Sequence, residues 1–559
     1  MKSFWRSLLL RRGPQTARLR GSSVRAKRPA RLISTSPQHP GPTGSHRVYK
    51  GVGLSIGTLG LVGWATFNLS TAHAEAAPEV PREKYFRLSE VRQHDGKAER
   101  VWVLRGTKVY DITEWVAGHP GGDVILRAGG GSVDPFWRIF SIHHKQDVYD
   151  ILDQYLIGQV DPVDLVDGGV PQEDLEDPFS QDPERDPRLR VHTDRPCNAE
   201  TPSSELTDFL TSNAMFYVRN HLWVPVDGED KHELNIELSD GTEKTYSLKE
   251  LRAKFKEHTV TVTLQCSGNR RKHMTVNARS TNGLQWEVGA IGTADWTGVR
   301  LRDVLADVGL EVDELPEDVK HVHFVGSEAY GASIPAETAV DRRGDVLLAY
   351  KMNGETLPRD HGYPLRVVVP GTVAARSVKW VSRISTSDEE STSQWQRRDY
   401  KCFGPNEGSK PDWDKAKSIQ ELPVQSAITS VTGVCTHSNS PHDRKLVEAY
   451  GLEEDSVVLQ GYAVSGGGRE IARVDISLDD GHTWRQAEIL ADEAKGSKHW
   501  TWKRWKCIVQ KRDVSTGYLV KAVDDSYNTQ PETHAHTYNF RGNLATAWHR
   551  ISADRNDRG

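Results

Sequence analysis

Apolar and polar side chains alternate over short stretches along much of the chain, a pattern typical of half-buried β-strands. Residues 101–112 alternate on either side of a turn at Arg105–Gly106, which predicts a hairpin. The run VTVTL at 260–264 predicts another strand. Helical spacing of apolar side chains is found at Val148, Ile151, Leu152 and Tyr155. The chain is therefore expected to combine strands and helices in a multidomain α+β fold.

The same patterns divide the chain into segments. Residues 80–162 form a compact unit of strands and a helix. Residues 163–190 are acidic and rich in Pro and Gly, and their apolar residues show neither helical nor strand spacing, as expected of a tether. Residues 191–418 mix strands and helices. Residues 419–559 hold short alternating strands separated by DG and GGG turns, which predicts an immunoglobulin-type β-sandwich.

The first 78 residues are interpreted as a targeting segment. Residues 1–74 contain 12 Lys and Arg and no acidic residue, the composition of a mitochondrial presequence. The apolar run at 51–69 borders on the length that spans a bilayer. We interpret the whole as a two-part import signal, cut near residues 72–77, that delivers a protein without a stable membrane span to the mitochondrial intermembrane space. A permanent inner-membrane anchor is the alternative.

Charge and cysteine content exclude several classes of protein. Beyond residue 74, 60 basic and 77 acidic residues give a net charge of −17. Such a body is a poor binder of nucleic acid and a suitable partner for a basic protein. The five cysteines form no CxxC pair and have no zinc-finger spacing, which argues against a disulfide scaffold.

Two histidines in the 80–162 unit are candidate haem ligands. His119 lies in an HPGG motif, and His143 follows 24 residues later in SIHH. Two imidazoles that approach from opposite sides are what a six-coordinate, electron-transferring haem iron needs. The segment resembles cytochrome b5 domains, and the resemblance implies that His119 and His143 bind haem b. His144 is the competing choice for the second ligand.

Residues 191–418 gather Arg, His and Lys at strand ends together with one distinctive thiol. Cys266 is followed closely by Arg270 and Arg271, and arginines favour the thiolate form, hence metal binding or nucleophilicity. This set of residues suits an anionic cofactor and an anionic substrate. A serine hydrolase is not indicated because GxSxG is absent, and SGGGRE at 465–470 lacks the context of a dinucleotide site.

Five motifs in this region are similar to the sulfite oxidase/eukaryotic nitrate reductase family: FYVRNH, TLQCSGNRR, AIGTADW, HGYPLRVVVPG and VKW. The resemblance covers nearly all of residues 191–559. It implies a mixed α/β molybdopterin-binding domain, followed by an immunoglobulin-like domain that forms a homodimer. Ser267 stands where the family more often has Ala, a mild departure.

The resemblance also implies roles for individual residues. Cys266 is the expected protein thiolate on molybdenum, which is held otherwise by the sulfurs of molybdopterin. The anion pocket is expected to contain Arg219, Arg271, Arg541, Trp286 and Tyr400. The pterin and its phosphate are expected to be held by Arg219, His221, His361, Arg366, Arg376 and Lys379. Arg541 lies far downstream, so its role requires the C-terminal tail to fold back towards the pocket.

The implied reaction is oxidation of sulfite to sulfate at molybdenum, with electrons passed one at a time through the haem to cytochrome c. A nitrate-reductase-like enzyme is the first alternative, but that family places its haem domain after the molybdenum domain and adds a flavin module. A haem electron carrier with a degenerate large domain is the second alternative. The intact Cys266 and its basic neighbours argue against it.

Overall fold

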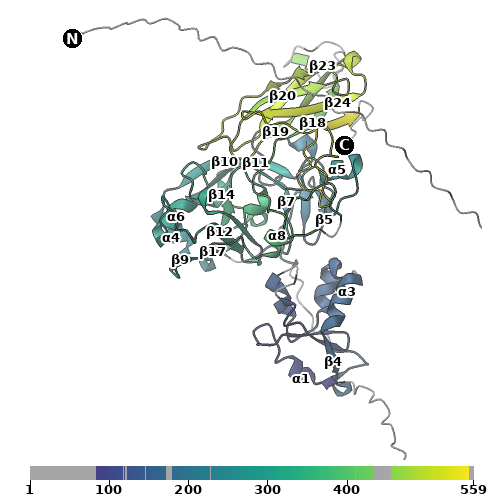
Figure 1. Cartoon of the computed structure of the whole chain (residues 1–559), viewed down its shortest axis with the longest axis vertical. Helices are drawn as coiled ribbons and strands as arrows, with labels where there is room; N and C mark the ends of the chain where they lie inside the picture. Colours follow the sequence, from purple (N-terminus) through teal and green to yellow (C-terminus); the bar gives the residue numbers. More distant parts are fainter. Residues whose placement is uncertain are drawn as a thin grey trace, which may run out of the picture. The chain divides into compact units, whose positions relative to one another are not determined.

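The computed structural model describes residues 84–552, apart from 117–118, 120–121, 145, 172–178, 227, 409–410, 434–446, 449–451 and 453–454. The expected presequence and its apolar run at 51–69 lie outside these residues. Among the described residues, no helix has both the length and the apolar character needed to cross a bilayer. Figure 1 shows the elements in chain order by colour.

The N-terminal domain is a small sheet with short helices around it. Its strand order is β1–β4–β3–β2, with β1 parallel to β4 and the rest antiparallel. The predicted hairpin is confirmed, with Gly106 at φ +55° in its turn. The bounds are β1 (Tyr85–Phe86), α1 (Leu88–Val91), β2 (Trp102–Arg105), β3 (Lys108–Asp111), η2 (Gly122–Ala128), α2 (Asp134–Ile139), η3 (Ser141–His144), α3 (Gln146–Leu152), η4 (Asp153–Tyr155), β4 (Leu156–Val160) and η5 (Pro162–Asp164).

The central body contains three sheets. One has the order β13–β12–β17–β8–β9, a second runs β10–β11–β14–β15 with β16 paired to β14, and the third is β5–β6–β7. Its strands are β5 (Arg190–Thr193), β6 (Asn198–Glu200), β7 (Val218–Arg219), β8 (Glu233–Glu237), β9 (Glu243–Ser247), β10 (His258–Gln265), β11 (Ile291–Arg300), β12 (His321–Gly326), β13 (Gly331–Pro335), β14 (Leu347–Met352), β15 (Glu355–Thr356), β16 (Arg366–Val368) and β17 (Val381–Ser387). Its helices are η6 (Ser203–Glu205), η7 (Glu229–Lys231), α4 (Leu248–Lys254), α5 (Arg271–Asn277), α6 (Leu301–Val308), α7 (Ala336–Val340), η8 (Arg359–His361), η9 (Ala374–Arg376) and α8 (Gln394–Arg397).

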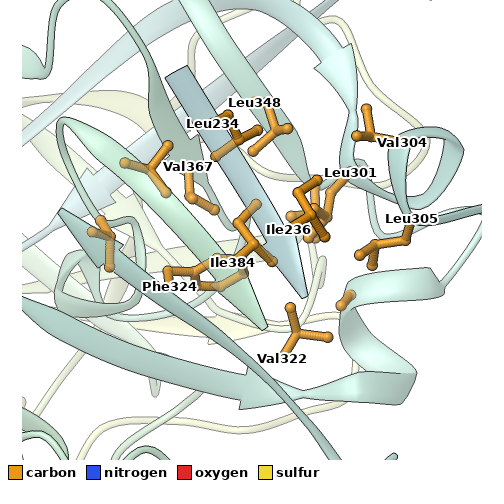
Figure 2. Close-up of a cluster of buried hydrophobic side chains, with 14 of the residues drawn as sticks. Leu234, Ile236, Leu301, Val304, Leu305, Val322, Phe324, Leu348, Val367 and Ile384 are labelled. Carbon is orange, nitrogen blue, oxygen red and sulfur yellow. The ribbon is translucent and has the colours of Figure 1, made fainter. Parts of the chain in front are cut away.

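Helix α6 shows how the main core of the body is built. Its apolar residues recur at helical spacing and are buried, and they are Leu301, Val304, Leu305 and Val308. The helix ends at Gly309, whose φ of +122° is unfavourable for other residues. The buried face packs against strands of two sheets, as Figure 2 shows for Ile236, Val322 and Leu348. This core holds the strands whose ends carry the polar residues described below.

Replacing Leu305 by alanine is expected to lower the free energy of unfolding of the body by about 2–5 kcal/mol, because the side chain is fully buried and leaves a cavity. Asp303→Ala, on the exposed face of the same helix, is the matched control and is expected to cost less than about 1 kcal/mol. Urea unfolding followed by tryptophan fluorescence measures both. Equal losses in the two chains would contradict the assignment of Leu305 to the core.

The C-terminal domain is a sandwich of two four-stranded sheets, ordered β18–β19–β23–β22 and β21–β20–β24–β25, and the predicted immunoglobulin-like architecture is confirmed. The two sheets enclose an apolar core that includes Val474, Trp505 and Val520. The bounds are β18 (Gln425–Gly433), β19 (Ser456–Val464), β20 (Ile471–Ser477), β21 (Arg485–Gln486), β22 (Glu488–Ile489), β23 (Lys503–Gln510), η10 (Lys511–Asp513), β24 (Gly517–Asp524) and β25 (His549–Ser552).

The expected tether at 163–190 is packed against folded structure over much of its described length. At its start, Leu165 and Val170 contact the core of the N-terminal domain, and Asp164 pairs with Arg87. At its end, Phe179 and Leu189 are buried against the body. Its acidic, proline-rich composition is that of a solvated linker, but individual apolar and charged side chains make long-range contacts that composition does not reveal.

Candidate active site and haem site

A cavity lined by apolar side chains and by several charged ones opens where the ends of several body strands meet. It encloses about 690 Å³ of empty space, part of it open to solvent. Seven of the residues expected at the cofactor or substrate line it, and they are Arg219, His221, Cys266, His361, Arg366, Lys379 and Tyr400. The wall is completed by Phe216, Tyr217, Asn220, Leu264, Ser267, Glu328, Tyr330, Asp360, Ala374, Ala375, Ser377, Val378 and Trp380.

Cys266 lies directly after β10, and its side chain is 6% exposed. Its backbone N–H donates to the carbonyl oxygen of Ala290 at 2.9 Å, which fixes the loop against the neighbouring strand. Gly268 follows, and a Cβ atom there would lie 2.4 Å from the Arg271 guanidinium. A larger residue here would require Arg271 to move, so glycine accommodates Arg271 where its hydrogen bonds hold it.

Arg219, His221 and Tyr400 form a hydrogen-bonded group in the wall. The Arg219 Nη2 donates to His221 Nε2 at 2.8 Å, and the Tyr400 hydroxyl faces the same nitrogen at 3.0 Å. Burial, reinforced by the charge of Arg219, lowers the pKa of His221 well below its ordinary value. The neutral ring therefore accepts at Nε2 and carries its proton at Nδ1.

A second group of polar side chains surrounds Lys379. Its ammonium donates to the side-chain oxygen of Asn220, to the Asp360 carbonyl oxygen at 2.9 Å and to the Arg219 carbonyl oxygen at 3.2 Å. Burial lowers the pKa of Lys379 to about 7. An anion bound beside it would stabilise the charged form.

Arg366 is buried and donates to neutral acceptors, the carbonyl oxygens of His361 at 2.8 Å and Ser377 at 2.9 Å. Burial lowers its pKa to about 10. A buried guanidinium, an ammonium and a thiol that line one cavity fit an anionic cofactor that also binds a metal through sulfur. These residues thus suit molybdopterin, whose phosphate needs cations and whose molybdenum needs a soft ligand.

Arg271 and Arg541 lie close to the cavity without lining it. The Arg271 guanidinium donates to the carbonyl oxygen of Leu284 at 2.7 Å and to that of Arg541 at 2.8 Å. It also interacts electrostatically with the side chains of Cys266 and Arg541. Arg541 pairs with Asp399 at 2.5 Å, directly before Tyr400. The C-terminal tail therefore folds back to the body, as the position of Arg541 required.

Trp286 and Arg376 lie away from the cavity wall. Trp286 is 1% exposed and packs edge-to-face with His192 at 4.7 Å between ring centroids. Arg376 is fully buried and donates to the Ile419 carbonyl oxygen at 2.8 Å and to the side-chain oxygen of Gln396. In this structure both side chains support the protein around the site, and a contact with substrate or pterin stays a prediction.

Sequence reasoning missed several wall residues. Asn220 and Asp360 are each adjacent in sequence to a predicted residue, and that adjacency was an available signal. Glu328 had no such signal. Its Oε2 atom is buried without a hydrogen-bond partner among the described residues, and burial raises its pKa to about 8. An unpartnered polar atom at a cavity wall is what a ligand group satisfies.

The N-terminal domain brings the two candidate haem ligands together. The rings of His119 and His143 are parallel within 8°, and their centroids are 6.3 Å apart. Because metal–imidazole bonds are about 2 Å long, this separation leaves room for one metal ion between the two rings. The Nδ1 of His143 lies 3.1 Å from the Phe140 carbonyl oxygen and donates to it, which leaves Nε2 for the iron.

The environment of His143 keeps its ring neutral, since burial lowers its pKa. Trp137 stacks on the ring at 5.3 Å and fixes its orientation. His144 is exposed instead. His143 lies beside the His119 ring and His144 is exposed, and the assignment of His143 as the second ligand stays a prediction.

Comparisons with known proteins match three family models to the chain. The cytochrome b5-like haem/steroid binding domain matches residues 87–161, the oxidoreductase molybdopterin binding domain matches 221–395, and the Mo-co oxidoreductase dimerisation domain matches 416–556. These matches support a molybdenum cofactor and a haem as the two prosthetic groups.

The relatives agree over nearly the whole chain. The mitochondrial sulfite oxidase of Rattus norvegicus is 44% identical over 93% of this chain and 92% of its own length. The mitochondrial sulfite oxidase of Homo sapiens is 45% identical over 83% of this chain and 84% of its own length. Among solved structures, the sulfane dehydrogenase SoxCD of Paracoccus pantotrophus matches with a TM-score of 0.50 at 25% identity, covering 66% of this chain and 86% of its own. The chain belongs to the sulfite oxidase family.

Proposed function

We propose that this chain is a mitochondrial enzyme that oxidises sulfite to sulfate at a molybdenum–molybdopterin centre and passes the electrons singly through a b-type haem to cytochrome c. The observation that carries the proposal is the buried thiol of Cys266 in one cavity with Arg219, Arg366 and Lys379. A chain of the sulfite oxidase family with this cavity and a paired-histidine haem domain has both redox centres that the reaction needs.

The residues of the cavity divide into a cofactor side and a substrate side. On the cofactor side, His361, Arg366 and Lys379 hold the phosphate of the pterin, and the Cys266 thiolate holds the metal. When bound, the molybdenum centre supplies two-electron oxidation and the oxygen atom that sulfite gains. Leu264 and Val378 form apolar parts of the wall, which lowers the local dielectric and strengthens these charge interactions.

On the substrate side, Arg219 and Tyr400 bind the anionic oxygens of sulfite. Arg219 supplies charge-assisted hydrogen bonds to a dianion in a shielded pocket. The Tyr400 hydroxyl donates a hydrogen bond to His221 Nε2 at rest and turns towards an oxyanion of sulfite when substrate binds. Arg271 interacts electrostatically with Cys266, and Arg541 with His221 and Tyr400, so both add positive charge near this side of the cavity.

Charge and targeting signals support the acceptor and the location. The net charge of −17 beyond residue 74 attracts a basic protein, and cytochrome c is such a protein. The basic leader and its apolar run support delivery to the intermembrane space, where that acceptor is found. The match to a dimerisation domain at 416–556 supports a homodimer.

The proposal is tested by purifying residues 78–559 with both cofactors and measuring sulfite-dependent reduction of cytochrome c. A steady rate that falls with rising ionic strength is expected, since screening weakens the attraction between acidic enzyme and basic acceptor. Nitrate with an artificial electron donor is the comparison substrate and is expected to give no turnover. A protein that contains molybdenum and haem but reduces nitrate and ignores sulfite would overturn the proposal.

A further inference from the structure

Residues 179–190, here called the anchor segment, bind the central body although their composition is that of a tether. Phe179 packs edge-to-face on Trp223 with ring centroids 6.2 Å apart. Asp182 accepts a hydrogen bond from the Val224 backbone N–H at 2.9 Å. These contacts fix the segment beside the loop that follows β7, the strand that carries Arg219.

Arg185 is the charged side chain of the anchor segment that reaches towards the cavity wall. Its Nε donates to Asp360 Oδ2 at 2.8 Å, and its Nη2 donates to Asp360 Oδ1 at 3.0 Å and to Asp182 Oδ2 at 2.9 Å. The Arg185 and Asp360 side chains are 17% and 9% exposed. A bidentate pair this sheltered is geometrically specific and is little screened by solvent.

The contacts continue from Asp360 to the inner surface of the cavity. Asp360 Oδ1 also accepts from the side-chain nitrogen of Asn220 at 3.0 Å. The side-chain oxygen of Asn220 in turn accepts from the Lys379 ammonium, which donates as well to the Asp360 carbonyl oxygen. Asp360, Asn220 and Lys379 all line the cavity. One chain of hydrogen bonds thus joins Arg185 to the ammonium that faces an anionic cofactor.

We propose that Arg185 is a positioning residue for the molybdenum cofactor, holding Asp360 so that Asn220 and Lys379 present the ammonium to the cavity. The proposal rests on the proposed function in that it assumes a molybdenum cofactor in this cavity. Arg185 neutralises the buried Asp360 carboxylate without itself lining the cavity. Lys379 is thereby left to the cofactor instead of being drawn to Asp360.

Removing Arg185 leaves the Asp360 carboxylate buried and unpaired, which is strongly unfavourable. Lys379 is the nearest cation on the same hydrogen-bonded chain, and its movement towards Asp360 would withdraw positive charge from the cavity. The expected consequence is weaker retention of the cofactor. Removing an outer-shell partner of a metal site costs about 10–100-fold in affinity.

The test measures loss of molybdenum per haem from the full mature chain, residues 78–559, in the absence of sulfite. Haem absorbance is the internal reference for the amount of folded protein. Arg185→Gln is expected to lose molybdenum about tenfold faster than the unaltered chain after gel filtration. Arg185→Lys is expected to lose molybdenum at an intermediate rate, because its single ammonium cannot make both hydrogen bonds that the guanidinium makes to Asp360. Equal loss from Arg185→Gln and the unaltered chain would overturn the proposal.

Arg188→Gln is the matched control. Arg188 lies in the same segment and makes a similar two-point contact, with Asp186, but it is 57% exposed and does not reach the cavity. It is expected to retain molybdenum like the unaltered chain. Rapid loss from Arg188→Gln as well would show a general weakening of the anchor segment and would count against a specific role of Arg185.

A double-mutant cycle separates positioning from folding. If Arg185 acts through Asp360, the double change Arg185→Gln and Asp360→Asn is expected to lose molybdenum no faster than Asp360→Asn alone. Additive effects would refute that route. Should Arg185→Gln fail to fold, Arg185→Lys carries the same comparison. Because no turnover is measured, molybdenum retention tests Arg185 even if the substrate is not sulfite.

Discussion

Replacing Cys266 by serine is expected to reduce sulfite-dependent turnover by about three orders of magnitude or more, equivalent to about 4 kcal/mol of transition-state stabilisation. A hydroxyl has the shape of the thiol but neither its softness nor its acidity, so it does not replace a thiolate on molybdenum. The side chain is 6% exposed at the end of β10, and the loop is held through backbone contacts that serine keeps. The haem spectrum is therefore expected to be unchanged.

Cys507→Ser is the matched control, because Cys507 is also a buried free cysteine but lies in the core of the C-terminal sandwich. It is expected to lower stability slightly and to leave turnover per molybdenum unchanged. For both variants, the steady-state rate of cytochrome c reduction is measured together with the molybdenum and haem content. A serine variant at 266 that retains normal turnover would remove Cys266 from the metal site.

Local sequence signals predicted the parts of the site that lie close together in the chain. Arg219 and His221 are two residues apart, a spacing that places both side chains on one face of an extended stretch, and the two are hydrogen bonded. Cys266 was expected at the end of a strand, and β10 ends at Gln265. In both cases the alternation of apolar and polar residues indicates where the strand lies, and therefore where the functional side chain is placed relative to it.

Long-range pairings could not be predicted in this way. Asp360 joins Asn220, which is 140 residues away, and Arg185, which is 175 residues away. Nothing in the local pattern of any of the three indicates such a contact, since each is an ordinary polar residue in its own segment. Their association depends on the packing of whole sheets, which only the folded structure specifies.

Arg376 illustrates the opposite case, in which a basic residue in a functional motif has an internal partner. The family resemblance implied that it holds the pterin, and it lies among other basic residues near a Pro-Gly turn. The structure directs its guanidinium to the Ile419 carbonyl oxygen and to Gln396. The position of an arginine in such a motif therefore does not by itself show that it faces the cofactor, and the contact of Arg376 with the pterin stays a prediction.

Replacing His143 by alanine is expected to remove the six-coordinate haem spectrum and to lower cytochrome c reduction by more than about a hundredfold. Losing a direct iron ligand should cost more than losing an outer-shell partner, which already costs about 10–100-fold. The ring lies 6.3 Å from that of His119 and is held by Trp137 and by the Phe140 carbonyl oxygen. Without it, one axial position of the iron is open, and electron transfer competes with ligand binding. Molybdenum content is expected to be normal.

The neighbouring His144→Ala is the control that makes this result specific. His144 is exposed, so its loss is expected to alter neither the haem spectrum nor the rate. If His144→Ala instead removed the six-coordinate spectrum and His143→Ala retained it, the second ligand would be His144, and the parallel arrangement of His119 and His143 would have another cause. If His143→Ala lost cytochrome c reduction while sulfite still reduced the molybdenum centre, the haem would be the obligatory route for the electrons, because oxidation of sulfite would then proceed only until the molybdenum centre is reduced.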